Sequence, residues 1–146
     1  MSSHVNCKLI VVGIASLALF PLMNAGPASA RPHSTGALVA TTFCVSSAGT
    51  GPGQRVYVVG DKPALGSWNP AKGFALKVHG SGKSATWSGS TVLPAGAPVQ
   101  YKYVKWDGKT ADWEADEPTK SKNREVRTPS AGHAIYNDHA FKQVKR

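Results

Sequence analysis

Two tryptophans stand where a side chain is hard to bury. Trp68 lies between Gly and Pro in Gly66-Ser67-Trp68-Asn69-Pro70, and Trp113 lies in the acidic run Asp112-Trp113-Glu114-Ala115-Asp116. A flat indole can stack on the apolar face of a sugar ring, while nearby Lys, Glu or Asn side chains hydrogen-bond its hydroxyls. A ring that removes about 50 Å² of apolar surface from water contributes on the order of 1 kcal/mol. The pair therefore indicates weak binding of a carbohydrate.

The other two tryptophans are predicted to serve the fold. Trp87 alternates with small residues in Thr86-Trp87-Ser88-Gly89, a pattern typical of a side chain in or near the core. Trp106 follows Lys105 at the end of a strand-like run, where we expect partial burial over neighbouring loops. The candidate sugar contacts are therefore the first two tryptophans.

Catalytic groups are scarce. A glycosidase needs two carboxylates on opposite sides of the scissile bond, and the candidates are the cluster at Asp112, Glu114, Asp116 and Glu117. This cluster is more simply a solvated acidic loop with one sugar-contacting glutamate. The histidines at positions 33, 79, 133 and 139 lack the spacing of a metal site. We therefore expect no enzymatic activity, no metal and no cofactor.

The net charge leaves a second class of function open. The chain has 146 residues, with 17 Lys and Arg against 8 Asp and Glu, and a formal charge of +9. This balance suits a basic protein that binds anionic polymers or nucleic acid, and the densest patch is Lys120, Lys122, Arg124 and Arg127. The basic residues are nevertheless spread along the whole chain, as on a solvated surface. We therefore expect no nucleic-acid partner and keep this class as the alternative. Salt dependence discriminates the two, because binding to phosphates falls steeply as salt rises, whereas stacking on a neutral glucan hardly changes.

The first thirty residues have the features of a secretory signal peptide. Lys8 precedes an apolar run from Leu9 to Met23, and Ala28-Ser29-Ala30 is a small-residue cleavage site. Cleavage there would give a secreted, extracellular protein without a membrane anchor. We expect a flexible arm at 31–37 and one monomeric domain at 38–146. Cys44 would be the one cysteine of the exported chain, which means a free thiol or an intermolecular bridge.

Short runs rich in Val, Tyr, Thr, Phe and Trp fill the rest of the chain. None repeats apolar residues at helical spacing, so little or no helix is predicted, and eight strands are expected at 38–46, 55–59, 74–78, 86–93, 99–106, 111–115, 123–127 and 133–141. In Val99-Gln100-Tyr101-Lys102-Tyr103 the period of two turns the tyrosines inward and Lys102 outward. The Pro and Gly at 93–96 predict that the strands 86–93 and 99–106 pair as a hairpin. Many short strands of this kind indicate an antiparallel sandwich or barrel.

Five motifs follow one another along the chain: VYVVGDKPALGSW at 56–68, LPAG at 93–96, VQYKYVK at 99–105, DWE at 112–114 and NREV at 123–126. Together they resemble the family 20 carbohydrate-binding module, the starch-binding domain often appended to amylases and glucoamylases. The resemblance implies an all-β fold, an antiparallel β-sandwich of the immunoglobulin-like open-barrel type with seven to eight strands. It also implies non-catalytic binding of α-1,4-linked glucans such as starch, glycogen and maltooligosaccharides, with secreted amylases as further partners.

The resemblance also implies which residues bind the sugar. Two tryptophans form a flat platform in that family, and they match Trp68 and Trp113 of this chain, joined by Lys102. Glu114 and Asn123 match polar positions that help to hold the sugar, although extra residues at 117–122 separate them. At the family's second sugar site this chain has no aromatic residue in 51–53 or 79–83. We therefore expect the second site to be weak or absent.

Overall fold

The computed structural model describes residues 36–46, 48–114, 123–138 and 140–142. The predicted signal peptide (1–30), most of the predicted arm (31–37) and the extra residues 117–122 lie outside them and stay predictions. Within the described residues the chain forms nine strands and three short 3-10 helices: β1 (Leu38–Ser46), β2 (Arg55–Gly60), η1 (Pro63–Leu65), η2 (Pro70–Lys72), β3 (Phe74–Ala75), β4 (Lys77–His79), η3 (Gly82–Ser84), β5 (Thr86–Pro94), β6 (Pro98–Trp106), β7 (Ala111–Trp113), β8 (Arg124–Arg127) and β9 (His133–Asp138). In this part of the chain no helix is long and apolar enough to cross a membrane.

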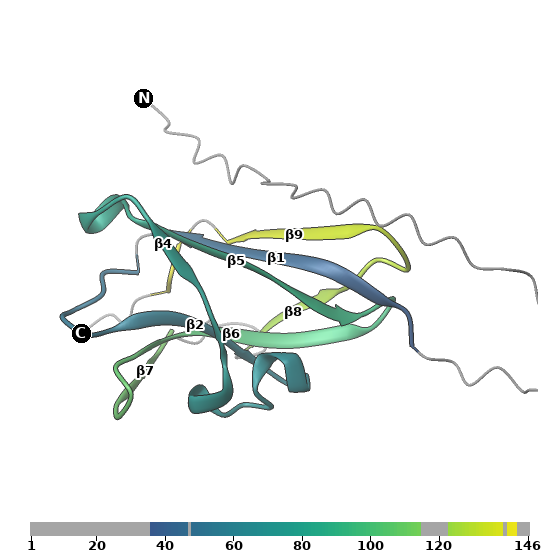
Figure 1. The fold of residues 1–146 in the computed structure, drawn as a ribbon, viewed down its shortest axis with the longest axis horizontal. Coiled ribbons are helices and arrows are strands. Elements are labelled where there is room, and N and C mark those ends of the chain that lie inside the picture. The colour runs from purple at the N-terminus through teal and green to yellow at the C-terminus, as the bar shows by residue number, and fades with distance from the viewer. Residues whose placement is uncertain (1–35, 47, 115–122, 139, 143–146) are drawn as a thin grey trace, which may run out of the picture. The chain divides into compact units, whose positions relative to one another are not determined.

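The strands form two sheets that lie one above the other, as Figure 1 shows. The first sheet has the order β4-β5-β1-β9, and the second has the order β3-β2-β6-β7 with β8 also paired to β6. All of these pairings are antiparallel except that of β1 with β9, which is parallel. The predicted all-β sandwich is confirmed. Its described part has nine strands where eight were predicted, because one predicted strand is divided at Leu76.

The run at 74–78 was predicted as one strand and is two. Phe74 and Ala75 pair with β2 in the second sheet, whereas Lys77–His79 pair with β5 in the first. Leu76, between them, is 4% exposed and its backbone N–H donates to the Val56 carbonyl at 2.9 Å. The chain therefore crosses from one sheet to the other at a buried leucine, which an apolar pattern alone does not reveal.

The predicted hairpin between 86–93 and 99–106 is wrong. β5 pairs with β1 and β4, and β6 pairs with β2, β7 and β8, so the turn joins the two sheets. Other segments satisfy the polar groups of this turn: Ala95 N–H donates to the Ala37 carbonyl at 2.7 Å and Gly96 N–H to the Pro129 carbonyl at 2.9 Å. Pro and Gly mark a turn but do not say whether its strands pair.

The core lies between the two sheets and is rich in aromatic side chains. Tyr101 and Tyr103 of β6 are at most 1% exposed, which confirms their predicted inward direction, and Trp87 is buried as predicted. Phe43 of β1 contacts Tyr101 edge to face, with ring centroids 4.9 Å apart. The other buried side chains of this cluster include Val45, Val56, Val58, Leu65, Leu76, Leu93 and Val99. The second sheet is thereby fixed against the first, with its other face outward.

Candidate functional site

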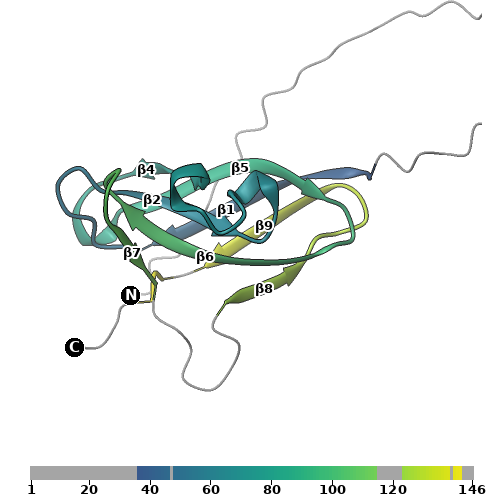
Figure 2. The ribbon, with the colours of Figure 1, turned by 90° about the horizontal axis from the view of Figure 1, so that it is seen from below.

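Lys102 and Trp113 lie on the outward face of the second sheet. Since residues 99, 101 and 103 of β6 face the core, its even-numbered residues face outward. Val104 is opposite Trp113 of β7 in the register, and residues directly opposite share a face of the sheet. Lys102 precedes Val104 by two residues on the same strand, so it is on this face as well. Figure 2 shows β6 running lengthwise, with β7 beside one end and β8 beside the other.

The loop that carries Trp68 folds over the same face. Val59, opposite Lys102 in the register, is fully buried on this outward side. Gly73 at the end of the loop packs on Val59 so closely that an added Cβ would come within 2.9 Å of the valine Cγ2. The loop therefore covers Val59 and lies beside Lys102. Trp68 is half-buried, and its backbone N–H donates to the Gly60 carbonyl at 2.8 Å.

The backbone at Trp68 is held in an uncommon conformation. Ser67 and Trp68 have φ angles of +48° and +65°, in the left-handed region that bulky residues rarely adopt. Residues in such conformations cost of order 1–3 kcal/mol each and persist because their surroundings fix them. Here Gly66, with φ of +79°, lies so close to the Lys72 carbonyl carbon that a Cβ would come within 2.6 Å. Leu65 anchors the loop in the core. The loop thus fixes the backbone that carries Trp68.

Asp61 joins this loop to β6 next to Lys102. Its backbone N–H donates to the Gln100 carbonyl at 2.9 Å, and its Oδ1 accepts from the Gln100 N–H at 3.1 Å. Its Oδ2 forms an ion pair with Lys62 at 2.8 Å. The start of the loop is therefore held in register with the strand that carries Lys102.

Trp113 is held by contacts on the opposite side of its short strand. Asp112, its neighbour in β7, forms a 2.7 Å ion pair with Lys105, which is 8% exposed and lies over the ring of Phe141. Glu114 exchanges two hydrogen bonds with the backbone of Tyr103: its N–H donates to the carbonyl at 3.1 Å, and its Oε1 accepts from the N–H at 3.0 Å. These contacts keep Trp113 opposite Val104, where it is half-buried on the outward face.

The structure does not bring Glu114 to the outward face. Its side chain is 1% exposed and pairs with Arg124 of β8, whose Nε and Nη2 donate to the two carboxylate oxygens at distances of 2.8 to 3.1 Å. A sugar on the outward face cannot reach a carboxylate that is used in this way. The contact implied by resemblance therefore does not fit the position of Glu114, which turns inward because Trp113 before it turns outward.

Asn123 does reach the outward face. It is half-buried, and its Nδ2 donates to Oε1 of Gln100 at 3.2 Å. Arg124 is opposite Tyr101, so the same register places Asn123 opposite Lys102. The structure thus gathers Lys102, Trp113, Asn123 and the Trp68 loop on one face. Gln100, which sequence reasoning did not select, joins them, and its even position in the alternating strand was the available signal.

Behind this face lies a polar cluster that sequence reasoning missed. Asp138 of β9 accepts the hydroxyls of Tyr101 and Tyr103 at 2.9 and 2.8 Å, and its other oxygen pairs with Arg124 at 2.8 Å. Burial, followed by the negative charge of Asp138, raises the pKa of both tyrosines well above the ordinary value. Burial would lower the pKa of Arg124, but its interactions with Glu114 and Asp138 together outweigh burial and raise that pKa. The cluster therefore joins both sheets through a charged arginine.

Comparison with known proteins identifies the family of the chain. The family described as "Starch binding domain" matches residues 38–137, which include every described strand but the last residue of β9. The chain belongs to the starch-binding domain family. A cyclomaltodextrin glucanotransferase from Bacillus sp. (strain 17-1) is 33% identical over 104 residues, which are 70% of this chain and 14% of that protein.

Two solved structures are similar to this starch-binding domain. A family 20 carbohydrate-binding module of a maltotetraose-forming amylase from Pseudomonas saccharophila has a TM-score of 0.52 and 28% identity, over 67% of this chain and the whole of the other. A family 15 glucoamylase from Hypocrea jecorina has a TM-score of 0.60 and 29% identity, over 70% of this chain and 17% of the other. The chain thus spans less than a fifth of the glucanotransferase and glucoamylase chains that it matches.

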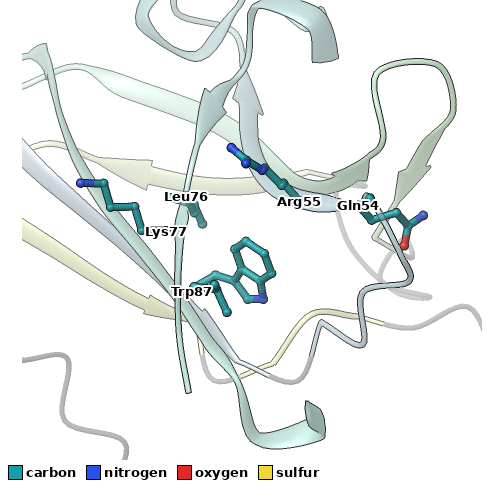
Figure 3. Close-up of a pocket in the computed structure, with 7 residues that line it drawn as sticks. Gln54, Arg55, Leu76, Lys77 and Trp87 are labelled. Carbon is teal, nitrogen blue, oxygen red and sulfur yellow. The ribbon is translucent and has the colours of Figure 1, made fainter. Parts of the chain in front are cut away.

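The starch-binding domain also has a cleft near the start of β2, shown in Figure 3. Its volume is about 610 Å³, and its lining consists of Gly53, Gln54, Arg55, Leu76, Lys77, Val78 and Trp87. Trp87 lines the cleft but is 6% exposed, so it offers a sugar little of its ring. The lining has two basic side chains and no carboxylate. The expectation that the second sugar site is weak or absent stays a prediction.

Two other expectations can be compared with the described residues. Of the predicted basic patch, Lys120 and Lys122 lie outside the description, and Arg124 is neutralised by Glu114 and Asp138. Arg127 donates to the Gly96 carbonyl at 2.7 Å. Cys44, in the middle of β1, is in no disulfide among the described residues and is 1% exposed. An intermolecular bridge needs an accessible thiol, so this burial argues against the bridge, one of the two expected alternatives.

Proposed function

We propose that this starch-binding domain binds α-1,4-linked glucans on the outward face of its second sheet and does not cleave them. Trp68 and Trp113 would stack on glucose rings, while Lys102, Asn123 and Gln100 would form hydrogen bonds to the hydroxyls. The observation that carries the proposal is the placement of Lys102 and Trp113 on one sheet face, beside the loop that holds Trp68. Glu114 is left out of the contacts because it is buried.

The chemistry of this face suits a neutral polymer. Its aromatic side chains are half-buried, so each offers part of a ring to solvent while the rest is held by neighbours. At about 1 kcal/mol for each stacked ring, two rings and a few hydrogen bonds give binding in roughly the millimolar to micromolar range. Weak single contacts of this kind are effective on granular starch, which presents many sites to a bound molecule.

A pull-down on granular starch tests the proposal, with cellulose as the control polymer and maltoheptaose as the soluble competitor. We expect retention on starch, release by maltoheptaose and no retention on cellulose. Trp113→Ala should weaken binding by about five- to tenfold, as expected for about 1 kcal/mol. Lys102→Ala should weaken it as well. Lys109→Ala, at an exposed lysine in the turn between β6 and β7, is the matched control and should bind normally.

The salt dependence of retention separates this proposal from the alternative, a basic protein that binds anionic polymers. Stacking on a neutral glucan should change little between low and high salt, whereas binding to phosphates falls steeply as salt rises. Arg55 and Lys77, which line the cleft, are among the described basic side chains that would serve the alternative. Retention that disappears at high salt, or that maltoheptaose does not release, would favour it and contradict the glucan proposal.

We further propose that the protein acts outside the cell as a monomer. The predicted signal peptide supports export. The glucanotransferase and glucoamylase that contain similar domains support a role beside starch-degrading enzymes. Secretion of the full chain from its host, followed by mass determination of the mature protein, tests both cleavage after Ala30 and the monomeric state.

A further inference from the structure

The outward face of β6 continues past Lys102 and Val104 to Trp106. Val104 is fully buried although it lies on the outward side of the sheet. Its register neighbours are Tyr57 on β2 and Trp113 on β7, and Trp106 follows it by two residues on its own strand. Large side chains on this face must therefore close over Val104. Trp113 is in this way part of an aromatic surface that is wider than Trp68 and Trp113 alone.

Tyr57 and Trp106 form the part of this surface that has no role so far. Their ring centroids are 5.6 Å apart and their planes make an angle of 72°, an edge-to-face contact. Both side chains are half-buried, so the pair is accessible from solvent. An edge-to-face contact fixes the direction of both rings while it leaves a face of one ring uncovered. This is the geometry of a rigid surface on which a sugar can stack.

The spacing places Trp106 close enough to Trp113 for one ligand to touch both. Trp106 is two residues beyond Val104, about 6.6 Å along β6, and Trp113 is one strand away, about 4.8 Å. Their Cα atoms are therefore on the order of 8 Å apart. Arg55, opposite Trp106 in the register, is exposed and can donate hydrogen bonds to hydroxyls at this end of the face.

We propose that Trp106, held by Tyr57, is a further sugar subsite that extends the glucan-binding face along β6. A chain whose rings lie on Trp68 and Trp113 would continue over Val104 and place its next units on Trp106. The subsite would make affinity depend on chain length, since a short oligosaccharide fills the first positions without reaching Trp106. The inference rests on the proposed function, and it adds a residue that the family resemblance does not supply.

Calorimetric titration with maltotriose and maltoheptaose tests the subsite. In Trp106→Leu, which keeps Val104 covered but removes the flat ring, affinity for maltoheptaose should fall about five- to tenfold while affinity for maltotriose is unchanged. Trp106→Phe, which keeps an aromatic ring, should retain most of the affinity. Trp106→Ile is a second ring-free variant with a good strand former, in case the leucine variant is unstable.

The outcomes separate the failure of this inference from the failure of the proposed function. Equal affinity of Trp106→Leu and the unchanged protein for maltoheptaose would overturn the subsite, as would an equal loss for both sugars, which would indicate a structural effect. If Trp113→Ala loses binding in the same series, the proposed function would stand without the extension. If the unchanged protein binds neither sugar, both proposals fail.

Discussion

Replacing the carboxylate of Glu114 should destabilise the domain far more than it affects any direct sugar contact. The glutamate is 1% exposed and accepts three hydrogen bonds from Arg124 and one from the Tyr103 N–H. Glu114→Gln keeps the size of the side chain but removes its charge, which leaves Arg124, 14% exposed, with Asp138 as its remaining carboxylate. Removing one partner of a buried ion pair costs about 3–5 kcal/mol.

Because Asp138 still balances part of the charge of Arg124, we expect the lower end of this range, about 3 kcal/mol. In a domain of this size that corresponds to a decrease of about 10 °C or more in the midpoint of thermal unfolding. Urea unfolding followed by tryptophan fluorescence measures the loss directly, with an unchanged m-value if the unfolded state is the same. Glu125→Gln makes the same change on an exposed glutamate of β8 and should stay within about 0.5 kcal/mol.

Two results would refute this reasoning. A Glu114→Gln variant within 1 kcal/mol of the unchanged protein would mean that the ion pair contributes little to the fold. A variant of normal stability with weakened affinity for maltoheptaose would mean that the carboxylate contacts the sugar, as the resemblance implies, and that the binding face rearranges around it.

Three further predictions concern the buried tyrosines, the Trp68 loop and the buried cysteine. The contribution of Tyr101 and Tyr103 to stability should be constant below the ordinary tyrosine pKa of about 10 and fall as pH rises above it. The reason is that both pKa values are raised in the folded state, so these tyrosines ionise first in the unfolded state. Urea midpoints between pH 8 and 11 measure this, and a flat profile would contradict it. Gly66→Ala should lower the free energy of unfolding by more than about 1 kcal/mol and weaken starch retention, because the alanine would clash with Lys72 and displace the Trp68 loop. Normal stability together with normal retention would show that the loop tolerates a left-handed alanine. Cys44 should react with a thiol reagent slowly in the native protein and quickly in urea, whereas rapid native labelling would show that the thiol is accessible.

Much of the fold follows from local pattern. The alternation through Gln100, Tyr101, Lys102 and Tyr103 gave the correct inward and outward directions, because one face of a sandwich sheet must pack against the other sheet. Sheet membership was harder to predict. The 93–96 turn was read as a hairpin and the 74–78 run as one strand, since neither turn residues nor an apolar run states which sheet the next residue joins.

The candidate site likewise has residues that the sequence could select and residues whose direction depends on contacts between strands. Lys102 and Trp113 could be selected because their residue types and local sequence settings are visible in the sequence, whereas Asn123 was selected through the family resemblance alone. The inward direction of Glu114 could not, because its partner Arg124 lies on another strand and the pair exists only once β7 and β8 both flank β6. Trp106 is partly buried as expected, but the register adds what the sequence could not show, namely that it shares the sheet face of Trp113 and contacts the ring of Tyr57.

The alternation of strands links the binding face to the polar cluster behind it. Trp113 and Asn123 point outward, and the residues that follow them, Glu114 and Arg124, point inward and pair with each other. The ion pair thus fixes the backbone of both outward residues from the opposite side of the sheet. Since the pair also reaches Asp138 in the first sheet, the position of these side chains depends on how the two sheets pack. A change in the core near Asp138 can therefore move the candidate sugar contacts without touching the outward face.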